Sequence, residues 1–318
     1  MEIANDKPVQ YKLNFSGEGS EFFSIIIVNW LLTIVTLGIY YPWARAGKFK
    51  YLYGSMALND DRFSFHGVGK EMFIGLVKVF GIILALFAIL FLFTLFDMQA
   101  LGVLLFYALL LLIVPLATHG AFRYRMSRTS LRGIRFGYRG DLKELTVNFL
   151  KWIFFTIITF GIYGAWMTIN IRKYTLNNVR YGDVQAQYRG EGGEFFFLNL
   201  KGYLLTLLTL GIYSFWWQAE LFDFYVNNLR FAKDDESLYL HSTATGGGFF
   251  SLLVVNLLII VFTLGLGYAW AEMRTMRFYA DHIVFSGNLN LDAVQQTEDV
   301  YTNAMGDDML SFFDIDLF

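Results

Sequence analysis

A short signature occurs four times in this sequence, each time at the end of an apolar run. It joins a threonine, a glycine two residues later and a tryptophan five residues after the glycine, and in three copies a tyrosine stands two residues after the glycine. Glycine suits the position after a helix, where φ is positive, and tyrosine and tryptophan suit a membrane–water interface. The residues are Gly38, Tyr40 and Trp43; Gly161, Tyr163 and Trp166; Gly211, Tyr213 and Trp216; and Gly265 and Trp270. The signature predicts tandem helical units that turn at the edge of a membrane.

The apolar content of the chain supports a membrane environment. Hydrophobic residues make up 56% of 318 positions and charged residues 16%, more apolar than soluble domains usually are. Met72–Phe96 and Leu101–Ala117 are long enough to predict a transmembrane hairpin. The other apolar runs have about 16 residues each, against about 20 for a span. They are Phe22–Leu37, Leu145–Phe160, Phe195–Leu210 and Phe249–Leu264.

Polar stretches between the apolar runs are also related to one another. Each tryptophan is followed by a less apolar helical segment, and then by short alternating runs closed by glycine, such as Asn14–Gly17 and Gln187–Gly190. Alternation of this kind indicates a strand that ends in a turn. Five tandem units are expected, at residues 12–64, 65–137, 138–187, 188–241 and 242–290, followed by an acidic tail at 291–318. The predicted fold class is an all-α polytopic membrane protein, with tandem helix-hairpin repeats and short β-strand connections on the cytoplasmic face.

The basic residues leave two topologies open. Arginine and lysine gather at residues 45–62, 123–143 and 172–189, and short basic connections normally stay in the cytoplasm. If the six apolar runs alone cross, the third cluster lies on the opposite face. If each unit is a helix hairpin, about ten helices cross, all three clusters share one face, and the related strands can pair there. Hairpins are preferred, although each charge in a second helix costs at least ~2.5 kcal/mol in a bilayer.

These repeated Gly-Ile-Tyr…Trp signatures and Phe-x-Gly strands resemble the YjgN-like family of bacterial inner-membrane proteins. The resemblance covers roughly residues 12 to 290, and Gly267 departs from it by replacing the tyrosine in the last copy. It implies a multi-pass protein of the bacterial inner membrane with a cytoplasmic C-terminus. It supplies no catalytic residues.

Polar residues in the second helical segments are the candidates for a functional path. They are Arg45, Asn170, Gln218, Glu220, Glu272 and Arg274. A central bundle could bring Arg45 beside Glu220 or Glu272, as an intramembrane pair of the kind that lines transport paths. Alternatively, these helices lie at the interface with their charges in water. The sequence leaves both interpretations open.

Other chemistries find little support in the sequence. The four histidines lack metal-ligand spacing, no nucleophile or base set stands out, and the net charge of −2 gives no reason to expect nucleic acid. We therefore expect no enzyme, cofactor or metal. The acidic tail with its interleaved apolar residues predicts a protein-binding segment, or else a plain disordered terminus.

The predicted function is transport or permeation of a solute through a polar path between repeats. The alternative is a non-transporting scaffold or lipid-organising protein that binds anionic lipid on the cytoplasmic face.

Overall fold

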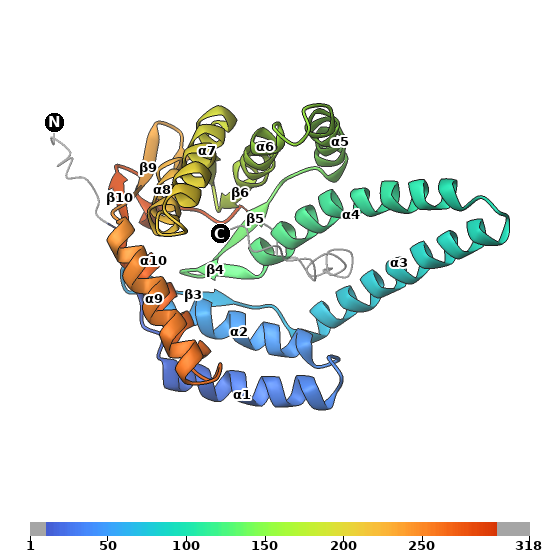
Figure 1. Cartoon of the computed structure of the whole chain (residues 1–318). Coiled ribbons are helices and arrows are strands. Elements are labelled where there is room, and N and C mark those ends of the chain that lie inside the picture. The colour runs from blue at the N-terminus through green and yellow to red at the C-terminus, as the bar shows by residue number, and fades with distance from the viewer. Residues whose placement is uncertain (1–10, 298–318) are drawn as a thin grey trace.

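The computed structural model describes residues 11–297, in which the order strand, helix, helix, strand occurs five times (Figure 1). Residues 1–10 and 298–318 lie outside the described part, and so does most of the acidic tail predicted to bind a partner. The helices are α1 (Gly19–Val35), α2 (Tyr41–Ser55), α3 (Gly69–Leu95), α4 (Gln99–Ser127), α5 (Leu142–Ile158), α6 (Gly164–Asn177), α7 (Gly192–Leu208), α8 (Ser214–Asn227), α9 (Gly246–Phe262) and α10 (Tyr268–Asp281). The strands are β1 (Leu13–Phe15), β2 (Met56–Leu58), β3 (Asp61–Phe65), β4 (Thr129–Leu131), β5 (Ile134–Tyr138), β6 (Val179–Tyr181), β7 (Val184–Tyr188), β8 (Leu229–Lys233), β9 (Glu236–Ser242) and β10 (Ile283–Gly287).

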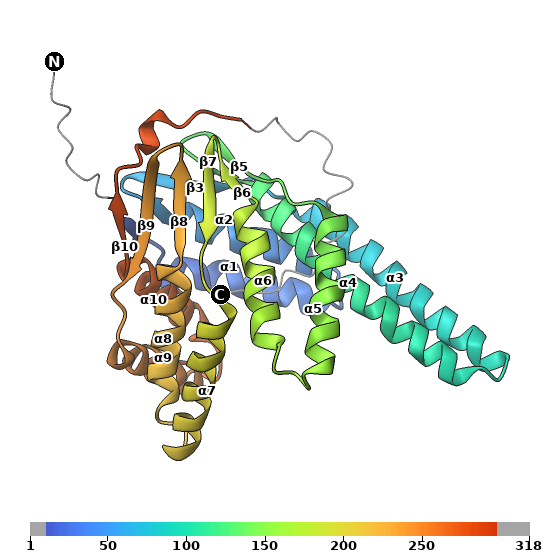
Figure 2. The same cartoon turned by 90° about the horizontal axis from the view of Figure 1, so that it is seen from above.

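The strands form one ten-stranded antiparallel sheet in which each strand pairs with its neighbours in the sequence. An isolated bridge between Lys12 and Val284 brings the first strand beside the last, so the sheet curls into a barrel-like ring (Figure 2). The two strands of each unit pair across the base of their helical hairpin, as Leu13 does with Leu58. Every hairpin of helices therefore leaves the ring from the same end.

Two-residue turns join neighbouring units at the opposite end of the ring. Asn59, Arg132, Gly182 and Asp234 in these turns have φ between 49° and 56°. Positive φ matches the primed turns whose twist suits paired antiparallel strands. The ring thus has a helix end and a turn end.

The predicted all-α fold class is wrong. The sheet is a closed layer of the molecule rather than a set of connections, and within residues 11–297 two helices, α3 and α4, are long and apolar enough to cross a membrane. The four shorter apolar runs became helices of 17 residues, about 25 Å long against about 30 Å of hydrocarbon. Neither six nor about ten full-length membrane spans is present in the described chain.

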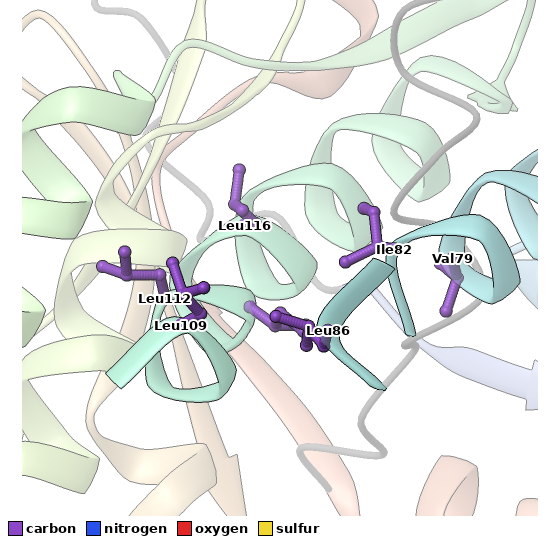
Figure 3. Close-up of a pocket in the computed structure, with 7 residues that line it drawn as sticks. Val79, Ile82, Leu86, Leu109, Leu112 and Leu116 are labelled. Carbon is purple, nitrogen blue, oxygen red and sulfur yellow. The ribbon is translucent and has the colours of Figure 1, made fainter. Parts of the chain in front are cut away.

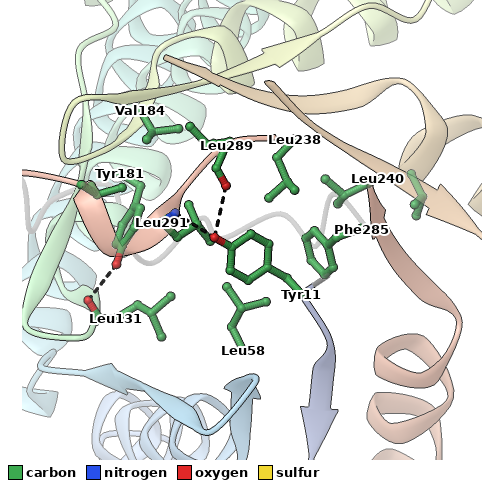
Figure 4. Packing of buried hydrophobic residues seen from close by; sticks show 12 residues of the cluster. Tyr11, Leu58, Leu131, Tyr181, Val184, Leu238, Leu240, Phe285, Leu289 and Leu291 are labelled. Carbon is green, nitrogen blue, oxygen red and sulfur yellow. Dashed lines mark hydrogen bonds between the residues drawn. The ribbon is translucent and has the colours of Figure 1, made fainter. Parts of the chain in front are cut away.

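Apolar side chains fill the inside of the ring (Figure 4). Successive residues of a strand point to opposite faces, so alternate positions such as Leu238 and Leu240 enter this core. The Tyr181 hydroxyl donates to the Leu131 carbonyl at 3.1 Å, and burial raises the pKa of Tyr181 to about 12. Leu289, which follows β10, is fully buried in the same cluster.

A segment after β10, residues 288–297, crosses the turn end of the ring; we call it the closing segment. The Tyr11 hydroxyl donates to the Leu289 carbonyl at 3.1 Å and accepts from the Leu291 N–H at 2.8 Å. Farther along, the Gln295 N–H donates to an Asp183 carboxylate oxygen at 3.2 Å. Burial alone would raise the pKa of Asp183, but the Lys233 ammonium and the Gln295 N–H outweigh burial and lower it. The closing segment and the apolar core together leave the ring filled.

Adjacent hairpins meet where a tryptophan of one unit packs on a glycine that begins the first helix of the next unit. A Cβ built on Gly192 would lie 2.8 Å from the Cα of Trp166. The same packing joins Trp43 to Gly69, Trp216 to Gly246 and Trp270 to Gly19. Trp43, Trp216 and Trp270 keep 37% to 43% of their surface exposed. These signature tryptophans therefore hold neighbouring units together while part of each ring faces outward.

Candidate functional site

The four signature turns form the tips of the short helical hairpins. In the first, Leu37 has φ of 50° and is followed by Gly38 with φ of 91°. The Thr36 hydroxyl donates to the Leu32 carbonyl at 2.7 Å and accepts from the Tyr40 N–H at 3.0 Å. The threonine of the signature thus closes the turn with its own side chain.

The outermost side chain of each short tip is apolar and almost fully exposed. Leu37, Phe160, Leu210 and Leu264 are 94%, 96%, 94% and 93% exposed. In the other three turns the threonine hydroxyl likewise accepts a hydrogen bond from the backbone N–H four residues later, at 2.9 Å, 2.9 Å and 2.6 Å. Four tips of one chemistry therefore project away from the ring.

The remaining tip, between α3 and α4 in the second unit, differs from the four short tips: its hairpin is longer and its tip residue is polar. Helices α3 and α4 have 27 and 29 residues, and their hairpin projects farther from the ring than the others do (Figure 2). Asp97, with φ of 55°, takes the place of the apolar tip residue. An apolar cavity of about 220 Å³ lies between the two helices and is lined by Val79, Ile82, Leu86, Leu109, Leu112, Ile113 and Leu116 (Figure 3).

Charged and polar side chains pair within the helical layer. Lys48 of α2 and Glu272 of α10 form an ion pair of 3.0 Å that joins the first unit to the last. Lys201 of α7 pairs with Glu220 of α8 at 2.6 Å, and the Tyr213 hydroxyl donates to the same carboxylate oxygen at 2.8 Å.

The candidate polar residues are thus distributed among several local contacts. The Arg45 guanidinium lies over the Phe49 ring at 5.4 Å, while Glu272 and Glu220 take lysines as ion-pair partners. The Arg274 guanidinium donates to Asn256 at 3.1 Å. Asn170 is half-buried and Gln218 is exposed.

Sequence reasoning did not use the lysines of the first helices, although their common position is a signal. Lys78, Lys151 and Lys201 each stand at the tenth residue of the first helix of their unit. Aligning the first helices by their starting residues would have shown this common level.

The base of the hairpins, next to the ring, carries exposed basic side chains. Lys50, Lys70, Lys143 and Lys173 are all exposed there. Arg128 is instead buried and held by Glu71 in a two-pronged ion pair, with distances of 2.7 Å and 3.0 Å. Basic residues at this level thus divide into a structural arginine and solvent-facing lysines.

Two of the four histidines lie on the outer face of the ring. His66 and His241 each form a hydrogen bond of 2.8 Å to a serine on a neighbouring strand. Within the described residues, no group of three histidine, cysteine or acidic side chains is placed to hold a metal ion.

A family model described as a bacterial protein of unknown function, DUF898, matches residues 10–189 and 216–312. The chain belongs to this family. The DUF898 protein is also 40% identical over 144 residues to inner membrane protein YjgN of Escherichia coli O157:H7, a match that covers 45% of this chain and 35% of the relative. YjgN of Escherichia coli K12 is 35% identical over 148 residues, with the same coverage. The Salmonella typhimurium protein is 34% identical over 134 residues, 42% of this chain and 33% of the relative.

The predicted resemblance to the YjgN-like family is confirmed, and these relatives are inner membrane proteins. The matched part of the chain spans about a third of their length. No solved structure matches the DUF898 chain.

Proposed function

We propose that this protein is a scaffold that organises lipids of the inner membrane, with its helical layer in the bilayer and its ring of strands on the cytoplasmic surface. The observation that carries the proposal is the division of the molecule into two ends. All five hairpins leave the helix end with exposed apolar side chains, while the ring behind them is filled and crossed by the closing segment. An anchored scaffold needs such an apolar end and needs no opening through the ring.

The lysines at the base of the hairpins supply the lipid selectivity of the scaffold. Lys50, Lys70, Lys143 and Lys173 are exposed where the helices leave the ring, at the level expected for headgroups. A basic side chain near an anionic surface contributes about 1 kcal/mol to membrane binding. Short basic segments also favour the cytoplasmic side of the inner membrane.

Lipid retention tests this proposal. We expect the purified protein to retain phosphatidylglycerol in preference to phosphatidylcholine, as measured by mass spectrometry of the bound lipids. Changing Lys50, Lys70, Lys143 and Lys173 to glutamine should lower phosphatidylglycerol retention several-fold. A matched control changes Lys12 and Arg62, exposed on the ring, to glutamine and should leave retention intact. Equal retention by both variants would contradict the proposal.

Transport is the second candidate function, favoured by the Lys48–Glu272 pair between the first and last units. The exposed fractions of these side chains are 35% and 17%, so a charged pair lies partly buried among helices. Any path must pass beside the ring, because the ring is filled. Replacing Glu272 with leucine should abolish a potassium or proton flux into proteoliposomes without changing protein abundance. An unchanged flux, or none with the native protein, removes this candidate.

A further inference from the structure

We propose that, of the five hairpins in residues 11–297, the α3–α4 hairpin alone crosses the membrane, and that the four short hairpins end inside the hydrocarbon of the near leaflet, the one that faces the ring. This inference deepens the proposed scaffold function and rests on it. It assigns one occupant, lipid acyl chains, to the exposed apolar surface of every short hairpin. Four features of the hairpins support it: the length of their exposed apolar surface, the level of their lysines, the polarity of their tips and the hydrogen bonding of the tip backbone.

The length of exposed apolar surface along the helix differs between the long α3–α4 hairpin and the four short hairpins. In α3 the exposed large apolar side chains run from Val77 to Phe96, which is about 30 Å of helix and matches the hydrocarbon thickness. In the first hairpin they run from Val28 to Leu37, about 15 Å. In α9 they run from Phe250 to Leu264, about 22 Å. The short hairpins therefore reach past the headgroups and stop before the far surface.

Lysines mark a common level on three of the first helices. Lys78, Lys151 and Lys201 are the tenth residues of α3, α5 and α7. Beyond that level α5 and α7 have 17 − 10 = 7 residues, about 10 Å, and α3 has 27 − 10 = 17 residues, about 25 Å. Lysine side chains extend toward headgroups when their helix enters lipid, so this level fits the near boundary of the hydrocarbon.

The polarity of the side chains at each tip matches the length of its hairpin. The long hairpin has Asp97 as its tip residue and Gln99 beside it, which suit water on the far side, while the exposed Phe96 and Met98 that flank Asp97 fit the boundary of the hydrocarbon. The short hairpins end in Leu37, Phe160, Leu210 and Leu264, each more than nine-tenths exposed. Exposing a leucine or phenylalanine to water at four separate tips is unfavourable, whereas contact with acyl chains is favourable.

The backbone of the short tips is equipped for a place without water. Hydrocarbon offers no hydrogen bonds, so polar backbone groups must be satisfied within the protein. At the first tip the N–H groups of residues 36–41 all donate within the turn, at distances from 2.7 Å to 3.1 Å. The Tyr40 N–H has the Thr36 hydroxyl as its acceptor, which explains why threonine belongs to the signature. Glycine at positive φ completes the turn without a side chain.

Single cysteines test the inference, because the native chain has no cysteine. The variants are Leu37→Cys, Phe160→Cys, Leu210→Cys and Leu264→Cys at the short tips, with Asp97→Cys at the long tip. Asp60→Cys in an exposed turn of the ring and Tyr107→Cys on the lipid-facing part of α4 serve as controls. Each is treated with a membrane-impermeant maleimide from either side of sealed membranes. In parallel, a fluorophore on the same cysteine is quenched by lipids that carry a spin label on the acyl chain.

We expect Asp97→Cys to react from the far side and Asp60→Cys from the near side. The four short-tip cysteines and Tyr107→Cys should react from neither side and be quenched by the acyl-chain label. Reaction of the short tips from the far side would show that they cross, and reaction from the near side that they lie outside the bilayer; either result overturns the inference. Phosphatidylglycerol retention is measured separately, so a crossing hairpin would refute the topology and leave the scaffold proposal standing.

Discussion

At the scale of single residues, two adjacent glycines at the start of α7 have opposite roles. A Cβ on Gly192 would lie 2.8 Å from the Trp166 backbone, whereas a Cβ on Gly193 has its nearest neighbour, a Trp166 ring atom, at 4.0 Å. We expect Gly192→Ala to destabilise the protein by about 1–3 kcal/mol, because the helices of two units must move apart. Thermal unfolding in detergent measures the change.

Gly193→Ala is the matched control for that prediction. Its φ is helical and its Cβ meets open space, so alanine should leave the stability unchanged or raise it by up to about 1 kcal/mol. Equal destabilisation by both substitutions would show that the packing of Trp166 on Gly192 does not join the units.

Residue spacing alone could predict part of the tips and little of the charge pairing. The glycine of the signature was expected to follow a helix at positive φ, and Gly38 does so. Whether Arg45 lies beside Glu220 or Glu272 depends on how the units are rotated relative to one another about a common axis. Residue spacing within one helix carries no information about that rotation. Lys48 stands three residues after Arg45, nearly one helical turn, and this position brings it to Glu272.

At the scale of elements, the closing segment depends on one buried hydroxyl. Tyr11 forms hydrogen bonds to both Leu289 and Leu291, and its ring is 5% exposed. Tyr11→Phe keeps the ring and leaves the Leu291 N–H without that acceptor, which should cost about 1–3 kcal/mol. We expect faster hydrogen exchange in residues 288–294, while exchange in the sheet stays slow.

Tyr203→Phe, which removes a tyrosine hydroxyl from the helical layer, is the control for Tyr11→Phe. Tyr203 in α7 is 60% exposed, so Tyr203→Phe should leave exchange in the closing segment unchanged. If Tyr11→Phe also leaves it unchanged, the Tyr11 hydroxyl does not hold the segment in place.

Elements differ in how far the sequence determines them. The paired helices of each unit follow from hydrophobic runs that end in a turn signature, and these were predictable. Strands of three to seven residues have their partners in other segments, so local alternation indicates a strand but not the sheet that it joins. In the structure, neighbouring units join at a turn that lies one strand closer to the N-terminus than the boundary predicted from the sequence. The first such turn is at Asn59, whereas the predicted boundary is at residue 64.

At the scale of the whole molecule, closure of the ring could not be predicted from the sequence. It depends on Lys12 meeting Val284, residues near opposite ends of the described chain, once five units have joined in one sheet. No single unit specifies where the two edges of that sheet lie. The resulting shape gathers all the apolar hairpins at one end, and on our inference this makes the protein insert unequally into the two leaflets of the membrane.

That asymmetry predicts a preference for curved membranes. On our inference, all five hairpins enter the near leaflet and one continues into the far leaflet, so the protein adds more area to the near side. A bilayer that bulges toward the ring accommodates this excess, and leaflet-inserted helices are sensitive to curvature for that reason. We expect protein reconstituted with its ring outside to reach a higher protein-to-lipid ratio in small vesicles than in large ones, as measured by fluorescence of single vesicles.

Asparagine at the short tips should weaken this preference. Leu37, Phe160, Leu210 and Leu264 have φ between 50° and 52°, a conformation that asparagine adopts readily, so changing all four to asparagine alters polarity with little backbone strain. Asp97→Asn at the long tip, where φ is 55°, is the matched control and should keep the preference. If the fourfold variant sorts by vesicle size as the native protein does, the short hairpins do not act as a wedge in one leaflet. Curvature would then have to originate from the ring at the headgroup surface.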